Sequence, residues 1–201
     1  MRRFLLLSIA LASTAPARAQ TAGPAPATAG LGGPLVAGVC LLSREAVFAN
    51  AKVGQAMTAR LRELAQQAQA EVDAERRPIE ADIRAFNAES ARLSADQRRT
   101  REQALAARLQ PVDAKAAQRS REIDATRVKA LGRVSTEFQP VVAQVYRQKG
   151  CGLLLDRNTV LGGNFGNDLT AAVVQGLDAR IQTISFEREV LPPAAPAAQR
   201  P

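Results

Sequence analysis

Apolar residues recur at steps of three and four over most of the chain between residues 57 and 145. In the first half they are Met57, Leu61, Leu64, Ala68, Val72, Ile79, Ile83, Phe86 and Leu93, and in the second half they are Leu105, Leu109, Val112, Ala116, Ile123, Val128, Leu131, Val134, Phe138, Val142 and Val145. This heptad-like spacing predicts long amphipathic helices. One straight helix of about 100 residues would be about 150 Å long, with no partner for its apolar stripe. We therefore expect an antiparallel helical hairpin over residues 53–145.

The expected turn of the hairpin lies near residues 93–96. Ser94, Ala95, Asp96 and Gln97 have the form of a capping box, in which Ser94 caps a new helix and Gln97 reaches back to it. Gly150 is expected to end the returning helix.

Three prolines interrupt the helical pattern. Pro78 and Pro111 lie on opposite arms at nearly the same distance from the expected turn, about 16 residues or about 25 Å. Because a proline inside a helix removes a hydrogen bond and kinks the helix, two of them at one level predict a hinge in the arms. The alternative is a pair of kinks that an exposed coil merely tolerates. Pro140 marks a third break, nearer the base.

The segments that flank the hairpin predict a small body at its base. Residues 35–42 are apolar and end at Ser43, which indicates a buried strand followed by a helix N-cap. Residues 152–161 read as a strand, a turn and a second short strand. A closing amphipathic helix is predicted by the stripe Val173, Val174, Leu177, Ile181 and Ile184.

The expected fold is therefore α+β and mostly α, with a β/α body made of residues 35–52 and 146–190 and a long helical hairpin projecting from it. The body has only two or three short strands, and the whole chain has six Phe, one Tyr and no Trp. So small a sheet with so few aromatic side chains is marginal for an independent core. We expect oligomerisation to complete it.

The N-terminus has the pattern of a secretory signal peptide over residues 1–19. Arg2 and Arg3 precede a short apolar run, and a small-residue cleavage site ends at Ala19. Cleavage would reduce the formal charge from +8, with 27 Lys and Arg against 19 Asp and Glu, by the three arginines of the peptide. Residues 20–34 and 191–201 are rich in Ala, Gly and Pro and are expected to be a disordered leader and tail.

The composition argues against an enzyme. The chain has no His, which is the commonest general base and a common metal ligand, and two Cys cannot form a four-thiolate site. A glycine-rich GxxxxGK[ST] phosphate loop does not occur in the sequence. We expect no catalytic residues, no metal and no cofactor.

Residues 154–161, Leu-Leu-Asp-Arg-Asn-Thr-Val-Leu, followed by Asp168-Leu169-Thr170, resemble the strand-turn-strand signature of the OmpH/Skp family of periplasmic chaperones. The capped turn, the signal peptide and the order of elements resemble that family as well, over about residues 36–186. The resemblance implies a periplasmic homotrimer whose bodies share a β-core and whose three hairpins surround unfolded outer-membrane proteins. Pro78, Pro111, Cys40 and Cys151 depart from the family pattern.

Cys40 and Cys151 are expected to lie near one another at the base of the hairpin, at equivalent distances from the turn. The oxidising periplasm permits a disulfide between them. Two buried free thiols are the alternative, since strand geometry can forbid the bridge.

Two sets of arm residues are candidates for binding. The apolar set, which would contact unfolded clients or instead form the seam between the arms, is Ile79, Ile83, Phe86, Leu93, Leu105 and Leu109. The basic set, which would attract acidic clients or an anionic lipid surface or would simply be a solvated face, is Arg84, Arg92, Arg98, Arg99, Arg101 and Arg108.

The leading hypothesis is an ATP-independent holdase that binds unfolded outer-membrane proteins between helical arms. A structural coiled-coil protein of the cell envelope, without catalytic function, is the alternative. Polyanion binding through the basic arms would be blind to sequence and steeply dependent on salt, so no specific nucleic-acid partner is expected.

Overall fold

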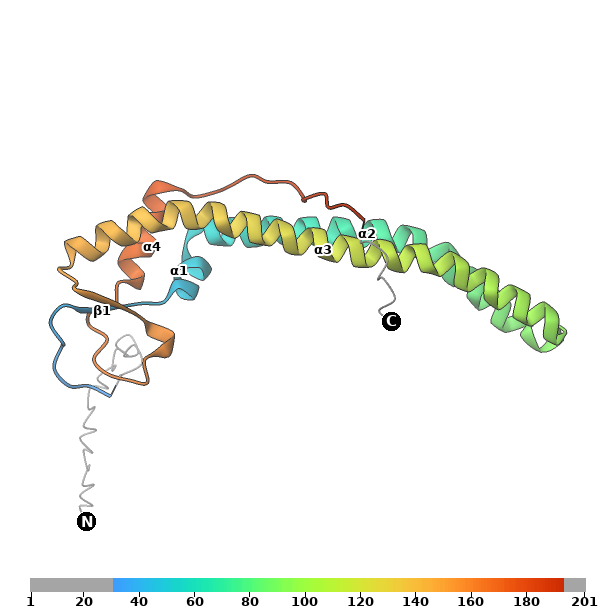
Figure 1. The fold of residues 1–201 in the computed structure, drawn as a ribbon, viewed down its shortest axis with the longest axis horizontal. Helices are drawn as coiled ribbons and strands as arrows, with labels where there is room; N and C mark the ends of the chain where they lie inside the picture. Colours follow the sequence, from blue (N-terminus) through green and yellow to red (C-terminus); the bar gives the residue numbers. More distant parts are fainter. Residues whose placement is uncertain (1–30, 194–201) are drawn as a thin grey trace, which may run out of the picture.

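The computed structural model describes residues 31–193, which form a small body and one long arm (Figure 1). The expected signal peptide, nearly all of the expected leader and residues 194–201 of the expected tail lie outside the described residues. The chain runs through β1 (Val39–Leu42), α1 (Arg44–Asn50), α2 (Lys52–Glu89), a 3₁₀ turn (Ser90–Arg92), α3 (Ala95–Gln148), β2 (Leu153–Asp156), a second 3₁₀ turn (Arg157–Thr159) and α4 (Thr170–Arg180). This order confirms the predicted fold class.

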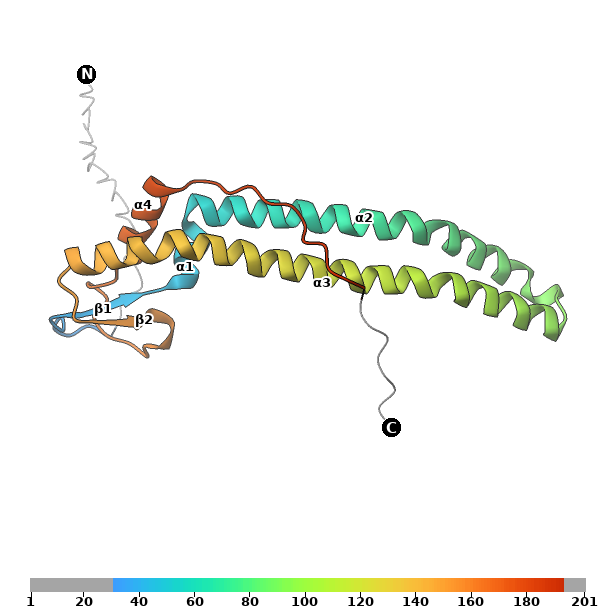
Figure 2. The ribbon, with the colours of Figure 1, turned by 45° about the horizontal axis from the view of Figure 1, so that its top comes forward.

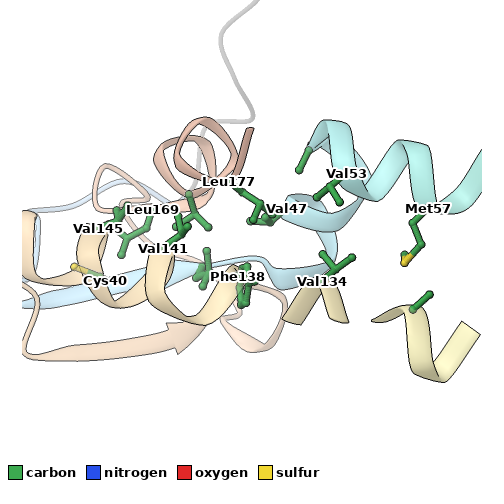
Figure 3. Packing of buried hydrophobic residues seen from close by; sticks show 14 residues of the cluster. Cys40, Val47, Val53, Met57, Val134, Phe138, Val141, Val145, Leu169 and Leu177 are labelled. Carbon is green, nitrogen blue, oxygen red and sulfur yellow. The ribbon is translucent and has the colours of Figure 1, made fainter. Parts of the chain in front are cut away.

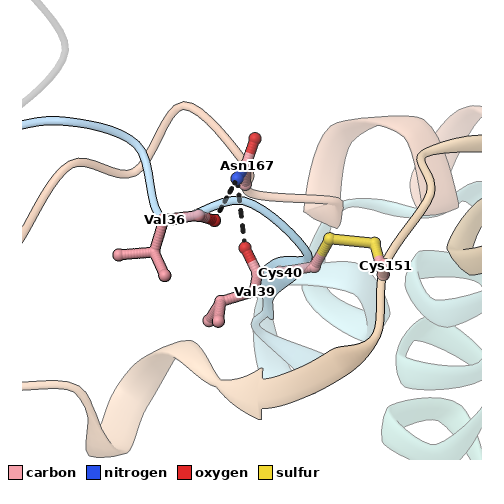
Figure 4. Close-up of a disulfide and its surroundings, with 5 residues drawn as sticks. All are labelled: Val36, Val39, Cys40, Cys151 and Asn167. Atoms are coloured by element: carbon pink, nitrogen blue, oxygen red, sulfur yellow. Dashed lines mark hydrogen bonds between the residues drawn. A yellow bond between two sulfur atoms is a disulfide. The ribbon is translucent and has the colours of Figure 1, made fainter.

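The two strands are parallel, with Val39 opposite Leu153 and Leu42 opposite Asp156. A parallel pair needs a long crossover, and here the whole hairpin is that crossover. The first strand is shorter than the predicted run, because Leu35 and Val36 are half or more exposed. The side-chain amide of Asn167 donates to the carbonyls of Val36 and Val39, at 3.2 and 3.1 Å, where the chain enters β1 (Figure 4).

The second short strand predicted within residues 152–161 is wrong. After β2 the chain forms a 3₁₀ turn, because the carboxylate of Asp156 accepts a hydrogen bond from the backbone N–H of Asn158 at 2.9 Å. Such side-chain caps draw the backbone away from strand pairing. Arg157 in this turn pairs with Asp168 at 2.9 Å.

The arm consists of α2 and α3, which lie side by side from the start of α2 to the tip, while the longer α3 continues past α2 into the body (Figure 2). At the tip, the Ser94 side chain accepts from the Gln97 N–H and the Gln97 side chain accepts from the Ser94 N–H, so the predicted capping box is present. At 54 residues, α3 is about 80 Å long. It ends at Gln148, and Gly150 follows with a φ of 66°, a left-handed conformation that glycine adopts at no steric cost.

The three prolines lie inside helices without ending them: Pro78 in α2, and Pro111 and Pro140 in α3. Pro78 and Pro111 share a level of the arm, since the Arg76–Asp113 and Arg108–Asp82 ion pairs bracket them. Both helices curve together over the outer half of the arm (Figure 1). At the level of these two prolines both helices are continuous, and the hinge stays a prediction.

The main core lies where α1, α3 and α4 meet beside the sheet (Figure 3). Phe138 is 2% exposed at its centre, with its ring centroid 5.3 Å from that of Phe48. Val173 and Leu177 of α4 are fully buried against it. The predicted continuation of α4 through Ile181 and Ile184 is wrong, because the helix ends at Arg180 and both residues pack on the core from extended chain.

Residues 182–193, which we call the strap, leave the body and run in an extended path along the arm (Figures 1 and 2). Residues up to 190 were expected to belong to the body, and residues from 191 onward to a disordered tail. In the structure its hydrogen bonds reach α2 at Arg60 and α3 as far as Gln118.

Candidate functional site

Four of the six apolar candidates lie in the seam between α2 and α3, the two helices of the arm. Ile79 is 5% exposed in a cluster with Val72 and Val112, and Ile83, Leu105 and Leu109 pack against that cluster. This is the alternative that the sequence left open. Phe86 and Leu93 are half-buried and lie nearer the turn. Client contact at these positions stays a prediction.

The six basic candidates are all exposed on the outer part of the arm. Arg101 pairs with Glu89 at 2.9 Å and Arg108 with Asp82 at 2.6 Å, both across the hairpin. Arg84, Arg92, Arg98 and Arg99 make no ion pair within residues 31–193. The tip therefore carries positive charge that the described residues do not neutralise.

Ion pairs join α2 and α3 over the outer half of the arm and fix their register there. From base to tip they are Arg119–Glu71, Lys115–Glu75, Arg76–Asp113, Arg108–Asp82 and Arg101–Glu89. Exposed pairs of this kind each contribute little, about 0–1 kcal/mol. Their effect here is to hold the arms in one alignment.

A buried charge cluster at mid-arm was not predicted. Glu122 is 1% exposed; it accepts from Arg119 Nη1 at 2.8 Å and from Gln118 Nε2 at 3.0 Å. Arg188 of the strap reaches it as well, with Nε 3.3 Å from Glu122 Oε2, and donates to Glu71 Oε1 at 2.9 Å. The heptad-like pattern predicted that Val128 is buried between the helices. In the structure Val128 is 71% exposed, and Thr126 is buried instead.

The pKa values of both carboxyls in this cluster lie below the ordinary range. Hydrogen bonding to the Arg188 guanidinium is the largest cause of the lowered pKa of Glu71, against an opposing effect of burial. For Glu122, burial acts to raise the pKa, but hydrogen bonds from Gln118 and Arg119 and the charge of Arg119 outweigh it. Both groups are therefore ionised and act as a receptor for cationic side chains.

A disulfide joins Cys40 of β1 to Cys151 just before β2, with Cα atoms 5.8 Å apart (Figure 4). It closes the base of the arm across a sequence separation of 111 residues. The sequence placed the two cysteines close together and left the bridge open.

The outer edge of the body exposes apolar side chains. Leu153 and Leu155 of β2 are 50% and 37% exposed, and Leu161 is fully exposed. A strand with one free edge and apolar side chains in solvent is a ready surface for pairing with another chain.

Other chemistry is sparse in the described part of the chain. Across residues 31–193 the acidic and cysteine side chains form no group of three or more that could hold a metal ion. In the same residues, no helix has the length and apolar character needed to cross a membrane.

Comparison with known proteins identifies the family. The model of the family described as outer membrane protein (OmpH-like) matches residues 38–177. A crystal structure of an OmpH-like outer membrane chaperone from Caulobacter crescentus is 37% identical, with a TM-score of 0.66, and the match covers 79% of this chain and 94% of that one. The search of curated proteins finds no match. This match spans the body and both helices of the arm. The chain therefore belongs to the OmpH-like family, a family of chaperones.

Proposed function

We propose that this protein is an ATP-independent holdase of the periplasm that binds unfolded outer-membrane proteins between its helical arms. The observation that carries the proposal is the architecture itself: a long arm, whose two helices contact mainly each other, projects from a small body. Family membership supports the same role.

The arm offers many weak contacts rather than one site. Half-buried apolar groups such as Phe86 and Leu93 lie among the exposed arginines of the tip. An unfolded barrel protein presents apolar strands and acidic side chains along its length. Several weak contacts on one chain give useful avidity and leave the client unfolded, and this requires no nucleotide.

The arms act together in an oligomer, and we propose a homotrimer. The two-stranded sheet of one chain is marginal on its own, and β2 exposes Leu153 and Leu155 at its free edge. Packing of several bodies through these edges would bury the leucines and direct the arms to one side. Such an assembly forms a cavity that a single arm does not have.

The proposed location follows from residues 1–19, whose pattern directs export. The Cys40–Cys151 disulfide supports an oxidising compartment. The four tip arginines without ion pairs in the described chain would also attract an anionic lipid surface, which is where the clients of such a chaperone are delivered.

Native mass spectrometry of the chain from Gln20, mixed with a urea-denatured outer-membrane β-barrel protein, tests the proposal. We expect a complex of three copies with one client, and no complex when the same barrel protein is already folded in detergent. A folded protein that stays free of client in both mixtures would contradict the proposal and favour a structural coiled coil.

A further inference from the structure

The strap shows how the arm binds an extended polypeptide. It lies along the inner part of the arm, where it contacts α2 between Arg60 and Glu71 and α3 between Gln118 and Arg133 (Figure 2). Its residues have no helix or strand of their own. Its fixed path therefore comes from contacts with α2 and α3.

About half of the polar contacts go to the main chain of the strap, and the rest go to its side chains Glu187, Arg188 and Glu189. Arg133 donates to the Ser185 carbonyl at 2.8 Å, Arg60 to that of Phe186 at 3.2 Å, Gln118 to that of Leu191 at 2.7 Å and Arg121 to that of Pro192 at 3.3 Å, while Thr126 accepts from the Glu189 N–H at 2.9 Å. Every polypeptide has these groups. These main-chain contacts do not depend on the sequence of the bound segment, whereas the contacts to its side chains do.

The side chains that the strap turns toward the arm follow a period of two. Ile184, Phe186 and Arg188 are partly buried, whereas Ser185 and Glu187 between them are exposed. The two apolar residues pack against the core cluster, and Arg188 enters the pocket formed by Glu71 and Glu122. Alternation of this kind is also the pattern of strands in outer-membrane barrels.

The strap fits its surface imperfectly. A cavity of about 140 Å³ lies beside it, lined by Thr126, Ala130 and Phe186 among others. The Nε of Arg188 is buried 3.3 Å from Glu122 Oε2 without the alignment of a hydrogen bond, so this ion pair is less well formed than the hydrogen bond of Arg188 to Glu71. Because the strap packs loosely on the arm, another extended segment can displace it.

We propose that the surface under the strap is a binding site for extended segments of the client, and that the strap occupies it as an intramolecular competitor. The segments it takes have apolar residues at alternate positions and a cationic side chain for the Glu71 and Glu122 pocket. This inference rests on the proposed holdase function. Because the strap is tethered, its effective concentration is high, and clients displace it by engaging several arms at once.

A peptide with the sequence of residues 182–193, labelled with a fluorophore, tests the site directly. We expect it to bind a chain that ends at Thr183, and to bind the full chain at least roughly tenfold more weakly because the strap is in place. The matched control peptide, with Arg188→Glu, should bind the shortened chain roughly tenfold more weakly. Absence of peptide binding to a shortened chain that keeps its helical circular dichroism would overturn the proposal, as would equal binding to both chains.

A full-length variant guards against misfolding of the shortened chain. Arg188→Ala loosens the strap and leaves Glu122 paired with Arg119 and Gln118. It should bind a denatured barrel protein about fivefold more tightly than the parent. Val190→Thr changes an 85% exposed strap side chain and should match the parent. If the parent holds the client but Arg188→Ala binds it no better, the strap is only a brace; if the parent holds no client, the holdase function itself fails.

Discussion

The disulfide between Cys40 and Cys151 makes the whole arm a closed loop anchored at the start of β1 and β2. In the chain-entropy view, a bridge over about 100 residues stabilises a fold by about 4–5 kcal/mol, because it restricts the unfolded chain. We predict that the double variant Cys40→Ser and Cys151→Ser loses roughly 3–5 kcal/mol of unfolding free energy in urea.

Reduction of the parent should give the same loss as the double variant, and should leave the double variant unchanged. A thiol assay on denatured, unreduced protein should find no free thiol. Two titratable thiols per chain would show that the bridge does not form.

The buried cluster around Glu122 predicts acid sensitivity. Glu71 and Glu122 have pKa values below the ordinary 4.5 in the folded protein. The stabilisation they provide is complete above that ordinary value and is lost as the pH falls through the lower folded values. Stability measured by thermal melting should therefore decrease below about pH 4.5.

Substitution Glu122→Gln should make this acid dependence shallower, and it should also lower stability at pH 7 because a paired charge is lost. Glu63→Gln, at a 60% exposed position paired with Arg60, is the matched control and should keep the parent's pH profile. An unchanged profile in Glu122→Gln would rule out this cluster as the cause.

The level of Pro78 and Pro111 predicts where the arm bends. Each proline removes a helical hydrogen bond, to the carbonyl of Ala74 or Ala107, so Pro78→Ala with Pro111→Ala should raise unfolding free energy by up to about 3 kcal/mol per site. The spread of distances between spin labels at Ala91 and Gln139 should narrow at the same time.

The single variant Pro140→Ala separates stability from bending. It should stabilise α3 and leave the spread of label distances to the tip nearly as broad as in the parent. If the double variant keeps the parent's distance distribution, these prolines are tolerated kinks and the hinge is wrong.

The tip arginines predict a salt-dependent encounter. Neutralising Arg84, Arg92, Arg98 and Arg99 to Gln should slow association with denatured client and weaken binding to anionic phospholipid vesicles, and it should flatten the salt dependence of both. Stopped-flow fluorescence over a salt series measures this. Neutralising Arg101 and Arg108, which are paired across the arms, should have a smaller effect on association; a larger effect would assign the steering to them instead.

Local signals in the sequence were sufficient for the hairpin. The capping box at Ser94 and Gln97 and the cap at Ser43 depend on residues three apart, and both appear in the structure. The heptad pattern correctly indicated Val134 and Phe138 as buried.

Contacts between residues distant in sequence explain the buried polar residues of α3 and the extended chain after α4, which were not predicted. Thr126 and Glu122 are buried because Glu189 and Arg188 of the strap satisfy them, and a search for apolar stripes passes over such positions. Ile184 continues the helical spacing of α4, but contacts of the strap with the arm hold it in extended chain. The spacing of Ile184, Phe186 and Arg188 at every second position is the feature of the sequence that indicates extended chain here.

The proposed function requires that the arms keep unfolded outer-membrane proteins from aggregating. The most direct test dilutes a urea-denatured outer-membrane β-barrel protein into buffer with and without the chain from Gln20, and follows light scattering without nucleotide. We expect scattering to be suppressed at a near-stoichiometric ratio of oligomer to client. Scattering as fast as in buffer alone, with the added protein folded and oligomeric, would contradict it.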